Sequence, residues 1–293
     1  MNARVSRVTM KPLAAVVLGV LVFSATVEMF ANQRASEAST PEGQTPPAVP
    51  GGGGRGRGRG GGPPPPPRAG APVDLTGAWV SVVTEDWQWR MRTPLAGDTT
   101  SVPLNGEGAR VARTWEPPMD GRCEAYGVGG IMRMPGRLKI SWQDDNTLKI
   151  ETDAGQQTRL LHFLAAGPSS PVSSPPPRTL QGTSVAEWQR SGGAFDAFLE
   201  RGAGAPPPRW GSLKVTTTNF LPGWLRRNGV PYSQNAVITE FFTRFTHPEA
   251  GDWFVVTTTV DDPQFLSLPF VTSTNFKKEP NDSKWNPTPC RAS

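Results

Sequence analysis

The chain has 293 residues, a formal net charge of +5 and a pI near 9.6, and its 32 glycines and 32 prolines are about twice the ordinary share. Two cysteines and two histidines exclude a dense disulfide scaffold and a zinc site built from three histidines, and we expect neither a metal nor a cofactor. The positive charge precedes the expected folded part: residues 1–38 carry +2, residues 39–73 carry +3, and residues 74–293 are neutral. A nucleic-acid-binding domain needs a basic surface of its own, so no nucleic-acid partner is expected.

The first segment, residues 1–38, has the pattern of a secretory signal peptide. Arg4, Arg7 and Lys11 form a positive region, and the apolar stretch Leu13–Phe23 follows it. That stretch is short for a transmembrane helix, which needs about 20 apolar residues. We therefore predict a bacterial protein that is periplasmic or secreted, with an uncleaved N-terminal anchor as the alternative.

The second segment, residues 39–73, has the composition of a linker. Of its 35 residues, 11 are glycine and 10 are proline. The run GGGGRGRGRGGGPPPPP has no apolar side chain whose burial could offset the entropy lost on ordering. We predict a disordered Gly/Pro/Arg-rich linker, and its arginines indicate a weak association with an anionic envelope surface.

The remaining segment, residues 74–293, alternates between apolar and polar residues, as β-strands do, and helical patterns are scarce. Eight to ten neighbouring strands tend to close on themselves. We predict an all-β domain with an antiparallel, lipocalin-like barrel, and the alternative is a two-sheet β-sandwich. The Pro/Ser/Gly-rich stretch near 190–209 is predicted to be a loop insertion, with one short helix over 194–201. The expected strands are 75–83, 138–142, 148–152, 158–163, 179–189, 213–217, 236–245, 253–260 and 270–276.

Cys123 and Cys290 are the two cysteines of the chain. In an exported protein they can form a disulfide that ties the C-terminal tail to an early loop. The alternative is a reactive thiol at Cys123, which no adjacent histidine in the sequence supports. We predict the disulfide.

Two segments carry a recognisable pattern. The first has Arg-Asn-Gly, Pro and Ser followed by Thr-Glu, and the second has Asp-Pro, Leu and Pro-Phe. The residues concerned are Arg227, Asn228, Gly229, Pro231, Ser233, Thr239, Glu240, Asp262, Pro263, Leu266, Pro269 and Phe270. This pattern resembles a family of secreted bacterial β-rich proteins that are usually described as hypothetical, and the resemblance extends over about half of the chain. It implies a secreted β-rich domain and names no activity. The chain departs from the pattern at Leu164–Val172 and in the insertion after Trp188.

The densest polar and aromatic cluster begins with Glu85 and Asp86 and continues with Trp87 and Trp89. In a strand, Glu85, Trp87 and Trp89 would share one face. Indole rings beside carboxylates suit a sugar or an aromatic ligand, which they bind by stacking and hydrogen bonding. The alternative is a pair of core tryptophans with a row of surface charges.

Other candidates for chemistry lie on separate predicted strands. Glu240 and Arg244 are four residues apart on one strand, so their side chains point the same way, either into the barrel or as an ion pair on its outer face. His162 could act as a general base, although a single histidine is more often structural. Arg159, on the strand of His162, is a candidate ligand-binding residue if it points inward.

These observations leave three functions open. The first is an exported barrel that binds a small apolar or aromatic ligand. The second is a cofactor-free extracytoplasmic hydrolase, isomerase or cyclase that uses the carboxylates in the barrel. The third is a module for interaction with the envelope or another surface. No G-x-S-x-G elbow is present and no phosphate-binding loop is recognisable, so neither a typical serine hydrolase nor a nucleotide site has support.

Overall fold

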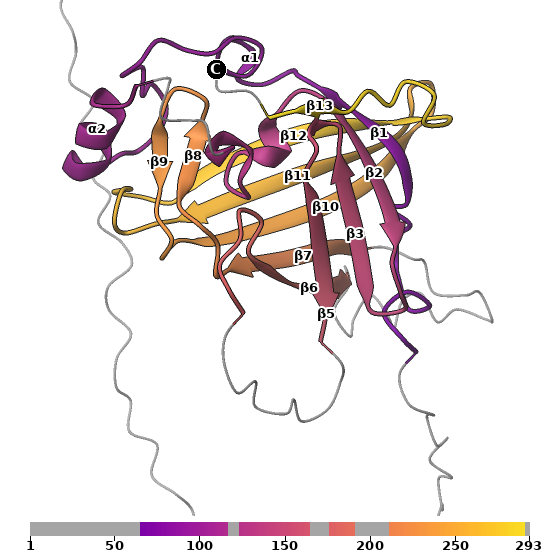
Figure 1. The fold of residues 1–293 in the computed structure, drawn as a ribbon. Helices are drawn as coiled ribbons and strands as arrows, with labels where there is room; N and C mark the ends of the chain where they lie inside the picture. Colours follow the sequence, from indigo (N-terminus) through magenta and orange to yellow (C-terminus); the bar gives the residue numbers. More distant parts are fainter. Residues whose placement is uncertain (1–64, 117–122, 165–175, 191–210, 291–293) are drawn as a thin grey trace, which may run out of the picture. The chain divides into compact units, whose positions relative to one another are not determined.

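The computed structural model describes residues 65–116, 123–164, 176–190 and 211–290, and these form a closed β-barrel (Figure 1). The predicted signal peptide, most of the predicted linker and the predicted helix at 194–201 lie outside the described residues. Around the barrel the strands follow the order β1-β12-β11-β10-β7-β6-β5-β3-β2, and β2 pairs with β1 to close it. Their bounds are β1 Gly77–Val82, β2 Arg137–Trp142, β3 Thr147–Thr152, β5 Thr158–Phe163, β6 Thr183–Arg190, β7 Gly211–Thr218, β10 Val237–His247, β11 Gly251–Asp261 and β12 Phe270–Glu279.

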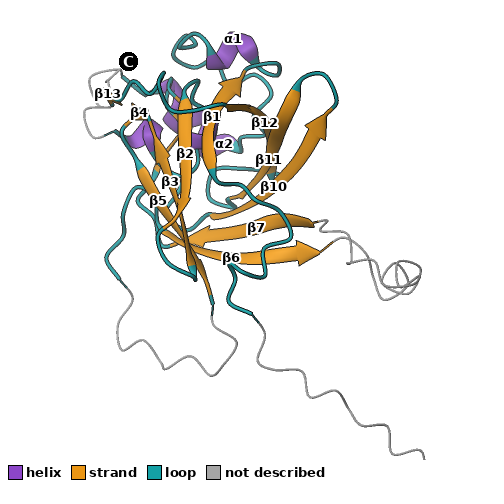
Figure 2. Cartoon of the chain, turned by 90° about the vertical axis from the view of Figure 1, so that its right-hand side faces the viewer, coloured by secondary structure: helices purple, strands orange, loops and turns teal. Residues whose placement is uncertain are grey.

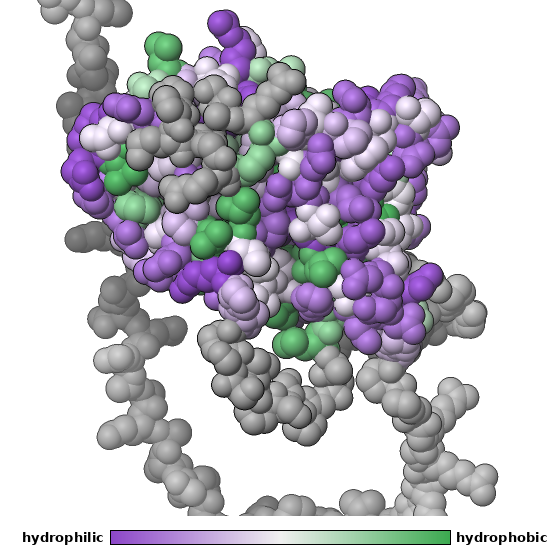
Figure 3. Space-filling model, in the orientation of Figure 1, coloured by the Kyte–Doolittle hydropathy of each residue, from purple (hydrophilic) through white to green (hydrophobic). Residues whose placement is uncertain are grey.

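The period-two pattern of the sequence produces the barrel wall. In β11, Phe254, Val256 and Val260 are buried and alternate with less buried residues, most of them threonine or valine. The two expected hairpins are confirmed as β2–β3 and β10–β11. The outward side chains are largely polar, and the side of the surface over β1 and β2 is mostly hydrophilic (Figure 3). The closed sheet confirms the predicted barrel in preference to the sandwich.

One pair of neighbouring strands departs from the prediction of an antiparallel barrel. β5 and β6 run parallel, with Leu161 opposite Ser184 and Phe163 opposite Ala186. A parallel pair requires a long crossover connection, because the chain must return to the end at which the first strand began. The connection over residues 164–182 is long enough for such a crossover. The barrel is therefore mixed, with the parallel pair β5–β6 among antiparallel pairs.

The middle of the barrel is packed with large side chains. Trp79, Phe242, Phe254 and Phe276 are each at most 1% exposed. The Phe254 ring centroid lies 4.6 Å from that of Trp79 and 4.8 Å from that of Phe276. These rings interlock across the interior, so the barrel axis holds side chains at this level and any ligand site must be sought nearer its ends.

One mouth of the barrel is covered by residues 65–76, which we call the strap. The indole N–H of Trp188 donates to the Pro67 carbonyl oxygen at 2.9 Å, and the backbone N–H of Arg68 donates to the Asp145 carbonyl oxygen at 3.1 Å. Val73 packs on the core. The described end of the segment predicted to be a disordered linker is thus packed against the barrel.

The opposite mouth is covered by the cap, which we define as the described residues of 83–136 and 219–236 (Figure 2). It has its own apolar core, in which Tyr232, Leu225 and Val230 pack on residues at the ends of the barrel strands, such as Ile238. Among the described residues, no helix is long and apolar enough to cross a membrane. The elements of the cap are α1 Trp87–Arg90, α2 Gly106–Arg113, the 3-10 turns η2 Glu124–Tyr126 and η3 Ile131–Arg133, and the hairpin of β8 Gly223–Arg226 and β9 Val230–Tyr232.

Two features hold the cap in place. The β8–β9 hairpin turns at Gly229, which has a φ of +79° and whose missing side chain leaves room for the Trp115 ring. The predicted disulfide is present between Cys123 and Cys290, with the Cα atoms 5.5 Å apart. It joins the start of η2 to the C-terminal tail beside the two-residue pairing of β4 Ala154–Gly155 with β13 Thr288–Pro289.

Candidate functional site

The strand geometry considered for Glu85, Trp87 and Trp89 does not occur, because the chain forms one helical turn there. β1 ends at Val82, and Asp86 adopts a left-handed conformation with a φ of +51° at the start of α1. Successive side chains on a helix turn by about 100°, so the two tryptophans do not share a face. Trp87 is 61% exposed, whereas Trp89 turns toward the protein.

Glu85 and Asp86 contact a group of buried arginines in the cap. We call Arg90, Arg133 and Arg226 the arginine cluster; they are 3%, 6% and 4% exposed. Arg90 forms an ion pair with Glu85, and its Nε donates to the Arg133 carbonyl oxygen at 2.9 Å. Arg133 Nη2 donates to Asp86 Oδ2 at 2.8 Å. The two carboxylates are therefore the counter-ions of the first two arginines.

Arg226, the third member of the cluster, has no counter-ion in direct contact among the described residues. Its Nε, Nη1 and Nη2 are all buried without a hydrogen-bond partner in the described part of the chain. The Trp89 ring centroid lies 4.7 Å from its Cζ. Burial, and after it the charge of Arg133, lowers the pKa of Arg226 to about 10. Arg226 thus carries unused hydrogen-bond donors and a charge that burial disfavours.

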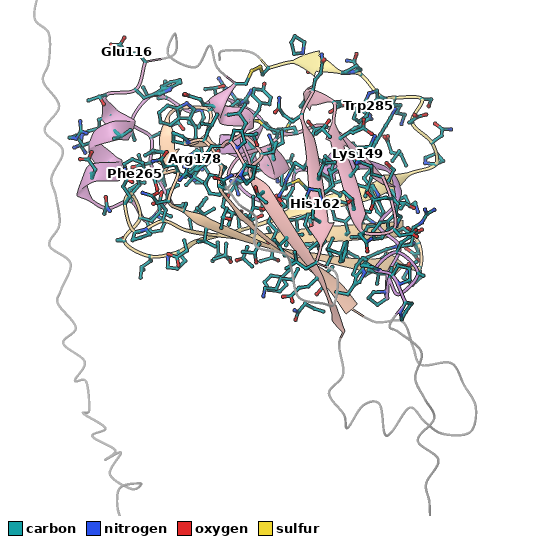
Figure 4. All side chains as sticks on the ribbon, turned by 60° about the horizontal axis from the view of Figure 1, so that its bottom comes forward. Glu116, Lys149, His162, Arg178, Phe265 and Trp285 are labelled. Carbon is teal, nitrogen blue, oxygen red and sulfur yellow. A yellow bond between two sulfur atoms is a disulfide. The ribbon has the colours of Figure 1, made fainter. Side chains whose placement is uncertain are left out.

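A second feature of the cap is a pocket of about 200 Å³ between α2, η2 and the β8–β9 hairpin, which we call the cap pocket. Its wall is mainly apolar. One of the lining residues is Phe265, which lies beside α2 (Figure 4). The Trp224 Nε1 atom is buried without an acceptor, and Tyr232 Oη makes no hydrogen bond of ordinary geometry among the described residues. The lining residues are Val111, Glu124, Pro222, Gly223, Trp224, Pro231, Tyr232 and Phe265.

The chemistry of the cap pocket follows from the two aromatic residues. Burial raises the pKa of Tyr232, so its hydroxyl is protonated at neutral pH and can donate a hydrogen bond. Trp224 can only donate. The pocket therefore suits a small apolar or aromatic molecule that carries a hydrogen-bond acceptor.

Glu240 and Arg159 meet inside the barrel. Arg159 Nη1 lies 3.1 Å from Glu240 Oε1, Nη2 lies 2.5 Å from Oε2, and both side chains are fully buried. Glu240 therefore points inward, and the alternative of an outer-face ion pair with Arg244 is wrong. Each charge neutralises the other, so this pair has a structural role as it stands.

Arg244 lies at the strap mouth, away from Glu240. Its Nη2 donates to Asp252 Oδ2 at 2.8 Å, and its Nη1 donates to the Asp74 carbonyl oxygen. It lines an open groove of about 1040 Å³ between the strap and the ends of β2 and β10, together with Trp142. Among the described side chains that line this groove, the arginine from the barrel wall is Arg244, which is already paired with Asp252.

His162 is on the outer face of the barrel (Figure 4). Its Nδ1 lies 3.4 Å from Thr147 Oγ1. The proposed catalytic set is thus divided: Glu85 and Asp86 are in the cap, Glu240 is in the barrel, and His162 is outside it. No group of three or more possible metal ligands occurs in the described ranges.

The residues that define the cap sites were missed in the sequence. Arg133 and Arg226 lie far from Arg90 along the chain, and Trp224 and Tyr232 lie on either side of the Asn228-Gly229 turn, outside every predicted strand. One signal was present: Arg226 directly follows the apolar residues Trp224 and Leu225, and the apolar Val230 follows the turn. An arginine next to apolar residues that become buried indicates either a buried ion pair or a ligand contact.

Comparisons of the chain with protein-family models, with curated proteins and with solved structures give no match. The resemblance to secreted β-rich bacterial proteins therefore stays a prediction.

Proposed function

We propose that this chain is an exported barrel protein that binds a small apolar or aromatic ligand in the cap pocket. The observation that carries the proposal is a mainly apolar pocket of about 200 Å³ lined by Trp224 and Tyr232, whose Nε1 and Oη atoms are buried without a hydrogen-bond partner among the described residues. Unpaired buried polar atoms are rare in native proteins, and a ligand acceptor would satisfy them. A cavity of about 150 Å³ already accepts benzene in another protein, so one substituted ring fits here.

The packed interior supports the cap pocket over the barrel axis. Lipocalin-like binding would need a hollow barrel, but Trp79, Phe254 and Phe276 fill the section where the ligand would lie. The barrel then acts as a rigid base, and the cap that it carries forms the pocket.

Two observations support export. The N-terminal sequence has a positive region followed by an apolar stretch. The Cys123–Cys290 disulfide is of a kind that persists in oxidising compartments. Both are expected of a periplasmic or secreted protein.

The proposal predicts saturable binding of acetophenone, whose ring fits the pocket and whose ketone can accept a hydrogen bond. Tyr232→Phe removes one donor and should raise the acetophenone Kd about three- to tenfold, the effect of losing one hydrogen bond. Toluene has no hydrogen-bond acceptor, so its Kd should be the same for the unmodified chain and for Tyr232→Phe. Ligand-observed NMR on the full chain measures both constants.

A blocking variant tests the location. Val111 lines the pocket from α2, and Val111→Trp should abolish acetophenone binding by filling it. Val237→Trp is the matched control, because Val237 is 40% exposed on β10 and does not line the pocket. Binding that survives Val111→Trp, or an absence of saturable binding to the unmodified chain, would contradict the proposal.

A further inference from the structure

The charges of the arginine cluster do not balance. Three buried guanidinium groups face two carboxylates in direct contact, Glu85 with Arg90 and Asp86 with Arg133. Asp86 and Asp98 both act on the charge of Arg226, but Asp86 is paired with Arg133, and Asp98 is partly exposed and accepts hydrogen bonds from Trp89 Nε1 and from the Thr100 backbone N–H. One positive charge in the cluster thus has no partner in contact among the residues that the structure describes.

The hydrogen-bond donors of the cluster are also in excess. All three guanidinium nitrogens of Arg226, and Nη1 of Arg133, are buried without an acceptor among the described residues. A buried donor without an acceptor is costly, and a buried charge without a partner is more so. Ordered water could accept the hydrogen bonds, but it would leave the charge in place.

We propose that the arginine cluster is a binding site for a small oxyanion, namely a carboxylate, phosphate or sulfate group held by Arg226 and Arg133. A guanidinium presents its donors in a planar fork that matches two oxygens of such a group. The Arg226 guanidinium lies over the Trp89 ring, with Cζ 4.7 Å from the ring centroid, and its unpartnered Nε, Nη1 and Nη2 donors are the atoms that the anion would bind. The site is separate from the cap pocket and does not depend on the function proposed for it.

Glu85 and Asp86 have a positioning role in this site. Asp86 fixes Arg133 Nη2 and leaves Nη1 without a partner. Arg90, held by Glu85 and by Ser81 Oγ at 3.1 Å, anchors Arg133 through the carbonyl oxygen of that residue. The carboxylates thus neutralise two of the arginines and orient them, and the third arginine remains to bind the anion.

The test is the melting temperature of the full chain in millimolar sodium sulfate, phosphate or acetate, each against sodium chloride at equal ionic strength. At ten times Kd the anion should raise Tm by about 4 °C, and the rise should saturate. A saturable rise with at least one of the three supports the site, and the tightest Kd identifies the head group. A lack of saturation with all three overturns it.

Variants distinguish the site from general salt effects, because sulfate and phosphate also stabilise proteins without binding. Arg226→Met should remove the saturable rise and leave Tm in chloride equal or higher, since an uncompensated buried charge is gone. Arg226→Lys keeps the charge and should weaken Kd about tenfold through the loss of the fork. Arg110→Met, at an exposed pair with Glu107 on α2, should keep the rise. A saturable rise that persists in Arg226→Met would overturn the proposal.

Discussion

Replacing Glu240 by alanine should lower the free energy of unfolding by about 3–5 kcal/mol, because it leaves the buried charge of Arg159 without a counter-ion. Arg159 contacts both Glu240 oxygens inside the barrel, and neither side chain has any solvent exposure. Arg159 Nε already lacks a partner among the described residues, and removing Glu240 takes the acceptors of Nη1 and Nη2 as well. Urea denaturation followed by tryptophan fluorescence measures the change, provided that the slope of the transition is unchanged.

Two controls separate the stranded charge from simple loss of contacts. The double variant Arg159→Met/Glu240→Leu removes both charges at similar volume and should recover most of the loss, to within about 1–2 kcal/mol of the unmodified chain. Glu187→Ala breaks the exposed pair with Lys214 and should cost less than about 1 kcal/mol. If Glu240→Ala costs no more than Glu187→Ala, the ion pair is not buried in solution as described.

For Glu240, the sequence could predict the face of the strand but not the partner of the side chain. The period of β10 placed Glu240 on the same side as Ile238 and Phe242, and all three are buried. Its partner could not be read from the sequence, because Arg159 is on β5, which is separated from β10 by β6 and β7 around the barrel. The parallel register of β5 with β6 sets that meeting, and a crossover connection leaves no local signal of register.

The segment around α1 shows a different limit. Glu85, Trp87 and Trp89 alternate as in a strand, but so short a pattern fits one helical turn equally well. Tertiary contacts decide between the strand and the helical turn. Arg90 donates to the Arg133 carbonyl oxygen and to Ser81, and Arg133 donates to Asp86. The cluster was recognised as polar and aromatic, whereas its arginine partners and its helical geometry depend on contacts distant in sequence.

The helix α2 was missed although the sequence contained its start signal. Asn105 caps the helix by accepting from the Gly108 N–H at 2.9 Å, and Glu107 pairs with Arg110 one turn on. Two glycines in the first turn lower the helical propensity of this segment. Packing explains one of them, since a side chain at Gly108 would collide with the Phe265 carbonyl oxygen.

The Cys123–Cys290 disulfide is expected to contribute strongly to stability. Cys290→Ser should lower the free energy of unfolding by about 2–5 kcal/mol, because Cys123 and Cys290 are 167 residues apart and the cross-link restricts a long loop in the unfolded chain. Cys123→Ser should have the same effect, and the double variant should lose no more than either single one. Urea denaturation with and without reductant measures the loss, and the double variant should not respond to reductant.

The disulfide also acts on the folded state, since few other contacts within the described ranges hold the C-terminal tail. β13 pairs with β4 over two residues, the Thr288 N–H donates to the Asp153 carbonyl oxygen at 2.8 Å, and Lys139 contacts Asp282 and the Trp285 ring. Reduction should therefore release the tail before the barrel unfolds, which hydrogen exchange at the Thr288 amide detects as a loss of protection. Protection that survives reduction would show that the β4–β13 pairing holds the tail without the disulfide.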